Sequence, residues 1–198
     1  MSDAYYAPHP RMRIEPALVL TGHPGSGVEA VARMLCARTG LVLNDVARSA
    51  ESVAGASRAH IVVERGLARL WEFEEAALRK ALRRRPVGVV VVPTALLQDD
   101  ARRAWLLERA RTVYVRRPME VLLARIRRQV AAAPGSLSDF MLGVPGDVEA
   151  LRAHLAVSER AVRDIGAIVE ARDRHPAHVA GELLEALDRL VQVEPIGT

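Results

Sequence analysis

The chain has 198 residues, half of them hydrophobic, with a formal net charge of +4 and a pI near 9.9. This length and composition exclude a disordered chain and predict one globular domain with a full core. No apolar run approaches the roughly 20 residues that span a membrane, and the first residues lack the apolar centre of a secretory signal. A single cysteine, Cys36, excludes an internal disulfide, and we expect a packed thiol. A cytoplasmic protein without membrane contact is therefore expected.

Arginine supplies almost all of the positive charge, because Lys80 is the single lysine among 28 basic residues. A basic pI permits binding to a polyanion, but solvated helix faces explain the same composition. The few aromatic residues do not alternate with the arginines, as a base-stacking surface requires. Nucleic acid is therefore not an expected partner, and a polyanion-binding module is the weakest functional hypothesis.

The first half of the chain alternates between predicted strands and helices. Residues 1–15 contain several prolines and are predicted as a flexible tail. An apolar run at 17–21 ends in glycine, as expected of a buried parallel strand. Apolar residues recur at helical spacing over 29–39 and stop at a glycine. A second strand is predicted at 41–43, and a second helix over 62–84.

The alternation continues beyond that helix. The strongest strand signal is the valine run at 88–92, which ends at proline. A helix is predicted over 99–110 and a fourth strand at 112–115. Proline suits the first helical turn, so the next helix is predicted over 118–130. Residues 131–146 are rich in glycine, alanine and proline, and are predicted as a mobile, lid-like loop.

The last elements complete the same pattern. A helix is predicted over 147–165, a fifth strand at 168–171 and a final helix over 177–191. Strands that alternate with helices indicate an α/β fold, in which helices cover both faces of a parallel sheet. We therefore predict a three-layer α/β/α domain over 16–192 with a five-stranded parallel sheet, and a second tail at 193–198.

A glycine-rich turn joins the first predicted strand to the first predicted helix. Its sequence is Gly22-His23-Pro24-Gly25-Ser26-Gly27-Val28-Glu29. The glycines match the phosphate-binding loop G-x-x-x-x-G-K-[ST], whose backbone N–H groups surround a phosphate at a helix N-terminus. Val28 stands at the lysine position and Glu29 at the hydroxyl position that holds Mg²⁺. The predicted phosphate-binding residues are Gly22, Gly25, Ser26, Gly27, Val28 and Glu29.

These two substitutions change the charge that a phosphate would meet. Val28 removes a cation, and Glu29 places a carboxylate beside the anion. Glu29 can ligate Mg²⁺, since carboxylates are good hard ligands, but we expect repulsion of the phosphates. Arg33, one helical turn further on, is a candidate replacement cation. A tight strand–helix turn without a bound anion explains the glycines equally well.

A second pattern follows the second predicted strand. Residues 45–55 match D-x-D-x-x-I-E-x-x-x-G at Asp45, Glu51 and Gly55, but Ala47 stands at the second aspartate. With the glycine turn, this pattern resembles the shikimate kinase family of small P-loop kinases, and the resemblance extends over about 16–190. It implies a nucleoside-monophosphate-kinase-like P-loop fold and transfer of a phosphoryl group from ATP, with Mg²⁺, to a hydroxyl of shikimate.

Other landmarks of that family are only partly present. Gly66 and Glu74 fit the pattern G-E-x-x-F-R-x-x-E, whereas Trp71 replaces the arginine that would bind the acid substrate. Thr94 stands in Pro-Thr-Ala, where the family has three glycines against which shikimate lies. Trp71 is more typical of a helix face packed into the core than of a residue that stacks on a ligand.

Two arginines match later landmarks of the family. Arg125 corresponds to an arginine near the adenine and the phosphates, and Arg160 corresponds to one that binds the substrate carboxylate. Arg160 on a solvated helix face is the alternative. The Arg-Pro of the family lid becomes 133–134, which is Ala-Pro here. The resemblance therefore implies a substrate-like pocket at Asp45, Trp71, Thr94 and Arg160.

Residues that set backbone shape are retained, while residues that carry charge are changed. Loss of one donor that stabilises transition-state charge costs roughly 10²–10³ in rate. The leading hypothesis is therefore a non-catalytic pseudokinase that binds a small anion, a nucleotide or a protein partner in a regulatory or scaffold role. The alternative is an active kinase for shikimate or a related metabolite, with Asp45 in the reaction and Asp45 or Glu29 on Mg²⁺. The histidines and acids predict no other metal site.

Overall fold

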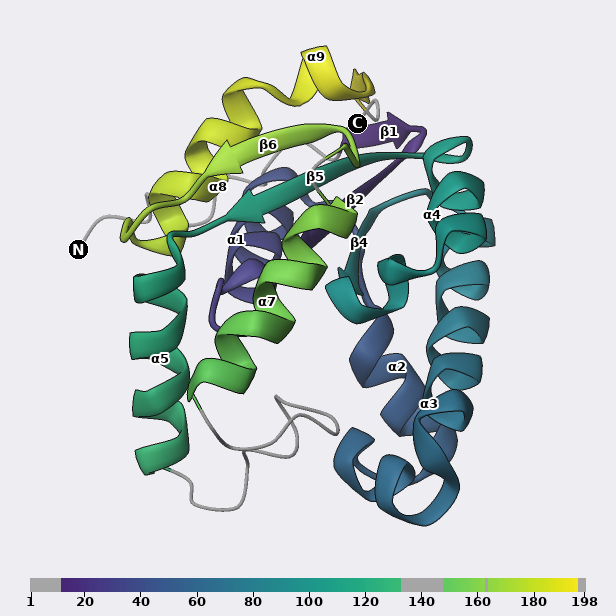
Figure 1. Ribbon diagram of the computed structural model, residues 1–198. Coiled ribbons are helices and arrows are strands. Elements are labelled where there is room, and N and C mark those ends of the chain that lie inside the picture. Colours follow the sequence, from purple (N-terminus) through teal and green to yellow (C-terminus); the bar gives the residue numbers. More distant parts are fainter. Residues whose placement is uncertain (1–11, 133–147, 163, 196–198) are drawn as a thin grey trace, which may run out of the picture.

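The computed structural model describes residues 12–132, 148–162 and 164–195 (Figure 1). Its centre is a parallel five-stranded sheet in the order β3-β4-β2-β5-β6. The strands are β2 (Ala17–Gly22), β3 (Leu43–Asp45), β4 (Val89–Pro93), β5 (Ala110–Arg116) and β6 (Ala167–Glu170). The predicted α/β class and the five-stranded parallel sheet are confirmed.

Helices connect the strands and cover both faces of the sheet (Figure 1). They are α1 (Val28–Thr39), α2 (Val46–Ala54), α3 (Arg58–Arg83), α4 (Asp100–Leu107), α5 (Met119–Ala132), α7 (Val148–Val162), α8 (Pro176–Glu185) and α9 (Leu187–Leu190). A 3₁₀ helix, η1 (Thr94–Gln98), follows β4. In the part of the chain that the structure describes, no helix is long and apolar enough to cross a membrane.

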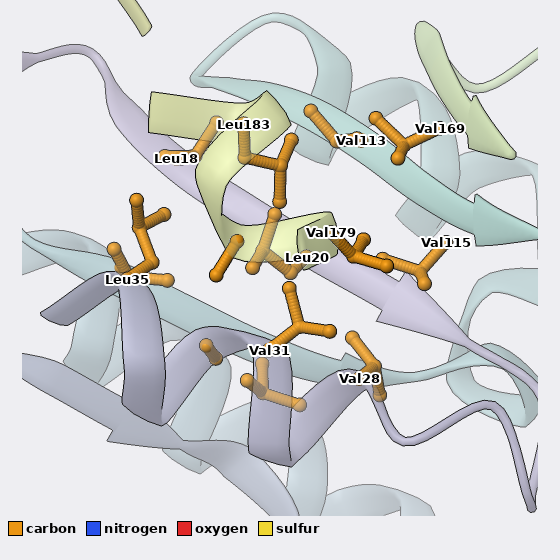
Figure 2. Packing of buried hydrophobic residues seen from close by; sticks show 14 of the residues in the cluster. Leu18, Leu20, Val28, Val31, Leu35, Val113, Val115, Val169, Val179 and Leu183 are labelled. Atoms are coloured by element: carbon orange, nitrogen blue, oxygen red, sulfur yellow. The ribbon is translucent and has the colours of Figure 1, made fainter. Parts of the chain in front are cut away.

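Two apolar cores lie on opposite faces of the sheet, because successive strand side chains point to opposite faces. Figure 2 shows one core, in which side chains of α1 and α8 pack against Leu18 and Leu20 of β2. Val19 points the other way, into a core shared with α3, α4 and η1. Each fully buried aliphatic side chain contributes about 1.5–3 kcal/mol to stability. The sheet and α1 therefore form a rigid base for the turn between them.

A third, smaller cluster joins α5 to α7. Leu122 and Ile126 of α5 pack against Leu151 and Leu155 of α7. Figure 1 shows α5 and α7 on one side below the sheet and α2 and α3 on the other. Helix α7 therefore has a fixed position against α5, and Leu155 also borders the cavity described below.

Several predicted boundaries are corrected. The strand expected at 41–43 lies at β3, two residues later, and α2 was not predicted because it buries only Val46 and Ala50. The helix expected over 177–191 is divided into α8 and α9 at Ala186, whose backbone has φ −98° and ψ 0°. Residues expected in the two tails form a ribbon, in which β1 (Met12–Glu15) pairs antiparallel with β7 (Gln192–Pro195). The predicted lid loop and its 133–134 landmark lie outside the described residues from 133 onwards.

Candidate active site

The glycine turn between β2 and α1 keeps the shape of a phosphate-binding loop. Gly25 and Gly27 have φ of 81° and 75°, a left-handed conformation that side chains disfavour. A Cβ at Gly22 would lie 2.5 Å from Ser26 Oγ, so a side chain at this position would force the buried Ser26 to shift. The turn is closed by Ser26 N–H, which donates to the carbonyl oxygen of His23 at 2.9 Å. Backbone N–H groups at the N-terminus of α1 are therefore available to an anion.

Arg117 fixes this loop through a hydrogen bond to its backbone. Its guanidinium is buried, and Nε donates to the carbonyl oxygen of Ser26 at 2.5 Å. The same group donates to carbonyl oxygens of the segment after β6, at Ala171, Arg172 and Arg174. Burial lowers the pKa of Arg117 from its ordinary value. Sequence patterns did not single out Arg117.

A cavity of about 980 Å³ opens at the carboxyl ends of β2, β3 and β4, where ligands of parallel sheets bind. Most residues that the sequence singled out line it: Gly22, Gly25, Gly27, Val28, Glu29, Asp45, Trp71, Thr94 and Arg125. Ser26 is 1 % exposed and lies beneath the loop. Arg160 is exposed on α7 and is not among the lining residues, so the structure does not bring it together with the other predicted pocket residues. The helix turns Ser158 toward the cavity instead.

Arginines supply the positive charge of this cavity. Five of them line it: Arg33, Arg48, Arg58, Arg125 and Arg128. Arg125 extends from α5 to the loop, where its Nη1 lies 3.7 Å from the position that a Cβ at Gly27 would occupy. Its Nη2 donates to Asp173 Oδ1 at 3.0 Å. A guanidinium therefore faces the loop that lacks its lysine.

The cavity wall formed by α3 holds a buried ion pair. Arg58 Nε donates to Glu74 Oε1 at 2.9 Å, and the Glu74 side chain is fully buried. Burial raises the pKa of Glu74, and the Arg58 charge opposes this shift. Trp71, one turn before Glu74, lines the same cavity. Arg58 was not singled out from the sequence, although a buried glutamate requires a cationic partner nearby.

Comparisons with known proteins decide the family. A sequence model described as Shikimate kinase matches residues 24–188. The chain belongs to the shikimate kinase family. It is 31 % identical over 178 residues to a shikimate kinase of Salinibacter ruber, which covers 89 % of this chain and 85 % of the relative.

Solved shikimate kinases share the fold of this family member. A shikimate kinase from Acinetobacter baumannii in complex with shikimate superposes with a TM-score of 0.75 at 22 % identity, covering 88 % of this chain and 93 % of that one. The enzyme from Aquifex aeolicus gives a TM-score of 0.71 at 18 % identity, covering 87 % and 96 %. These likenesses extend over nearly the whole chain and establish the P-loop kinase fold.

Two carboxylates in this shikimate kinase homologue fit a divalent cation. Asp45 ends β3 and caps α2, where Oδ1 accepts from Arg48 N–H at 3.1 Å, and Glu29 is exposed in the first turn of α1. Both line the cavity. Within the described residues, no group of three or more acids, histidines or cysteines gathers as a metal site. Mg²⁺ is usually held by one or two carboxylates together with substrate phosphates, so this donor set suits it.

A buried histidine of the loop joins α7 to the cavity wall. His23 is 2 % exposed, with Nε2 at 3.2 Å from Glu159 Oε2 and Nδ1 at 3.5 Å from Thr94 Oγ1. The Tyr114 hydroxyl donates to the same glutamate oxygen. The hydrogen bond from His23 lowers the pKa of Glu159, which is therefore charged at neutral pH. The sequence indicated only that His23 is near the site, and Glu159 had no signal of its own.

Proposed function

We propose that this member of the shikimate kinase family transfers the γ-phosphoryl group of ATP to a hydroxyl of a small carboxylic acid. The observation that carries the proposal is that the phosphate-type loop, Arg125 and Arg58 with its partner Glu74 lie at one and the same cavity. It supplies cations for a triphosphate and for a carboxylate within one enclosure. Names of relatives make shikimate the first acid to test.

Arginines replace the loop lysine in this proposal. Catalysis of phosphoryl transfer depends chiefly on positioning and on stabilisation of the charge that spreads over the phosphoryl oxygens. Arg125 faces Gly27, and Arg33 and Arg128 line the same cavity. Guanidinium groups bind phosphate oxygens in pairs and keep their charge when buried, which makes them suitable substitutes.

Arg58 would bind the carboxylate of the acceptor acid. Its side chain is 19 % exposed and is held by Glu74 through Nε, and it lines the cavity with two further guanidinium nitrogens as donors. Fixing the arginine before binding lowers the ordering cost of recognition. This arginine belongs to α3, as Trp71 does, and it provides the positive charge that Trp71 lacks.

Asp45 and Glu29 would hold Mg²⁺ with the phosphates of ATP. The ion, when bound, neutralises charge on the β- and γ-phosphates. The role of Glu29 then changes from repulsion to coordination, since its carboxylate is a suitable hard ligand. Asp45 also positions the start of α2 through its contact with Arg48 N–H.

Binding without transfer, as in a pseudokinase, is the second candidate. It is favoured by Val28, which is 3 % exposed and packs in the core, and by the methyl group of Ala47 in the cavity wall. Neither residue can offer charge to a phosphate or accept a proton. The two candidates share the same bound ligands and differ only in turnover.

Calorimetry and an ADP-release assay with shikimate test both candidates on the full chain. MgATP binding with turnover supports the kinase. MgATP binding without ADP formation, in the presence of shikimate or another small hydroxy acid, supports the pseudokinase. The change Arg125→Ala is expected to weaken MgATP binding about tenfold, equivalent to roughly 1.4 kcal/mol. Arg127→Ala is the matched control, because Arg127 is exposed on the same helix and does not line the cavity. Absence of MgATP binding would overturn both candidates.

A further inference from the structure

Thr94, His23 and Glu159 form a line of polar groups at the cavity wall, in which His23 is buried and Glu159 is partly exposed. Thr94 borders the cavity, and its Oγ1 lies 3.5 Å from His23 Nδ1. On the other side of the imidazole, Nε2 lies 3.2 Å from Glu159 Oε2. A hydroxyl, an imidazole and a carboxylate in this order can move a proton away from a reacting group.

From this geometry we infer that Thr94 and His23 form a proton relay that serves the acceptor hydroxyl. The inference rests on the proposed kinase function. Ala47 stands at the second aspartate of the family pattern, and a methyl group cannot accept a proton, so an active enzyme needs another acceptor. Thr94 stands where the resemblance places the substrate. Thr94 is the group that touches the acceptor, and His23 acts through it.

The hydrogen-bond partners of the imidazole favour the tautomer that a relay requires. The Glu159 carboxylate accepts from the Tyr114 hydroxyl and holds a proton on His23 Nε2. A neutral imidazole protonated at Nε2 has its lone pair on Nδ1, which faces Thr94 Oγ1. Long hydrogen bonds of 3.5 Å are common in ligand-free sites and shorten when substrate is bound.

The step balances with groups that are already named. The acceptor oxygen forms a bond to the γ-phosphorus while the bond from that phosphorus to the ADP oxygen breaks, and ADP keeps the electron pair. The acceptor proton moves to Thr94 Oγ1 as the Thr94 proton moves to His23 Nδ1. Glu159 stabilises the resulting imidazolium. After product release the proton returns through Thr94 to water.

Charged groups around the imidazole support this assignment. In the described chain, Glu159 reaches His23 from α7 and Tyr114 packs against it from β5 with ring centres 5.7 Å apart. Arg116, also from β5, acts on Glu159 through its charge. A single carboxylate in direct contact favours the imidazolium that the relay forms.

The test measures shikimate-dependent ADP release from the full chain between pH 5 and 9. Thr94→Val and His23→Gln are each expected to lower kcat about 100-fold, as for loss of general-base catalysis. KM for shikimate and Kd for MgATP are expected to stay within about twofold of the wild-type values. The pH profile of kcat is expected to change in His23→Gln, because the relay then lacks its imidazole.

Matched controls separate the relay from packing. Thr112→Val changes a buried threonine of β5, and His178→Gln changes an exposed histidine of α8. Both are expected to keep wild-type kcat and pH dependence. Nitrogen NMR of His23 should show the proton on Nε2 in the folded, ligand-free protein, and a proton on Nδ1 instead would overturn the relay whatever the activity.

The outcomes distinguish the relay from the function on which it rests. A wild type that turns over while Thr94→Val and His23→Gln keep its kcat and pH profile overturns the relay alone. A wild type that binds MgATP without turnover overturns the relay together with the kinase proposal, and leaves the pseudokinase. Loss of MgATP binding in either variant would show that the replaced residue maintains the structure of the loop. This result also overturns the relay.

Discussion

Arg117 Nε lies 2.5 Å from the carbonyl oxygen of Ser26, so a buried guanidinium connects the phosphate-type loop to the segment after β6. Replacing Arg117 by alanine leaves carbonyl groups without donors in a buried place. We expect the free energy of unfolding to fall by about 2–4 kcal/mol, measured by urea denaturation. Arg111→Ala, which changes an exposed arginine of β5, should alter it by less than about 0.5 kcal/mol. An equal effect in both variants would contradict the role of Arg117.

The Arg58–Glu74 pair gives a pH-dependent prediction. Removal of Arg58 leaves the Glu74 carboxylate buried without its partner, which costs about 3–5 kcal/mol at neutral pH. Burial already raises the pKa of Glu74, and loss of Arg58 raises it further. A raised carboxyl pKa means that stability is present at low pH and is lost as pH rises through the folded-state pKa.

Denaturation of Arg58→Ala across pH 4–8 measures this effect. The deficit relative to the wild type should be smallest at pH 4 and grow toward pH 8. Arg58→Ala combined with Glu74→Gln should recover part of the loss at pH 8, because the buried charge is then removed. A deficit that is constant with pH would show that Arg58 stabilises the protein by packing alone.

Glu159 has the opposite pH dependence. Its pKa is lowered, first by the hydrogen bond from His23 and also by the one from Tyr114. A carboxylate with a lowered pKa contributes stability above its unfolded-state pKa, and this contribution is lost as pH falls through the folded-state pKa. Glu159→Gln should therefore lower stability by about 1–2 kcal/mol at pH 7 and by less under acid conditions.

Thermal unfolding at pH 7 and pH 3.5 tests the sign. The unfolding temperatures of Glu159→Gln and wild type should converge at the lower pH. Glu64→Gln, at an exposed glutamate of α3, is the control and should follow the wild type throughout. Divergence of Glu159→Gln from the wild type as pH falls would contradict the assignment.

The sheet and the loop could be predicted from the sequence more fully than the charged side chains that surround the loop. Apolar runs such as 88–92 and glycines that permit a left-handed backbone act over short distances, so their structure could be predicted. Arg117 and Glu159 act on residues far along the chain, and the contact between Arg117 and Ser26 spans 91 positions. Sequence patterns do not register such contacts.

The choice of Arg160 shows the same limit at close range. The family resemblance pointed to Arg160 on α7, but an α-helix rotates each successive residue by about 100°. Two residues earlier, Ser158 is 2 % exposed and accepts from Gln98 Nε2 at 2.6 Å. A shift of one or two positions therefore decides which side chain faces the site, and only packing against α5 and η1 settles the rotation.

Restoring the standard loop should strengthen nucleotide binding and reduce stability. Val28 is 3 % exposed and packs with Val31 and Val115, so a lysine at position 28 must leave this core. We expect Val28→Lys with Glu29→Ser to tighten MgATP binding at least tenfold, since both the lysine and the hydroxyl contact phosphate and metal. Loss of the buried valine should lower the free energy of unfolding by about 1–3 kcal/mol.

Calorimetry with MgATP and urea denaturation measure the two effects separately. Val63→Lys is the matched control, because Val63 is exposed on α3 and its replacement should change neither quantity. Tighter binding would show that backbone N–H groups of the loop, such as those of Gly25 and Gly27, still form a phosphate site. Unchanged binding in a folded double variant would show that the loop has lost this capacity, and the arginines of the cavity would then have to bind ATP without it.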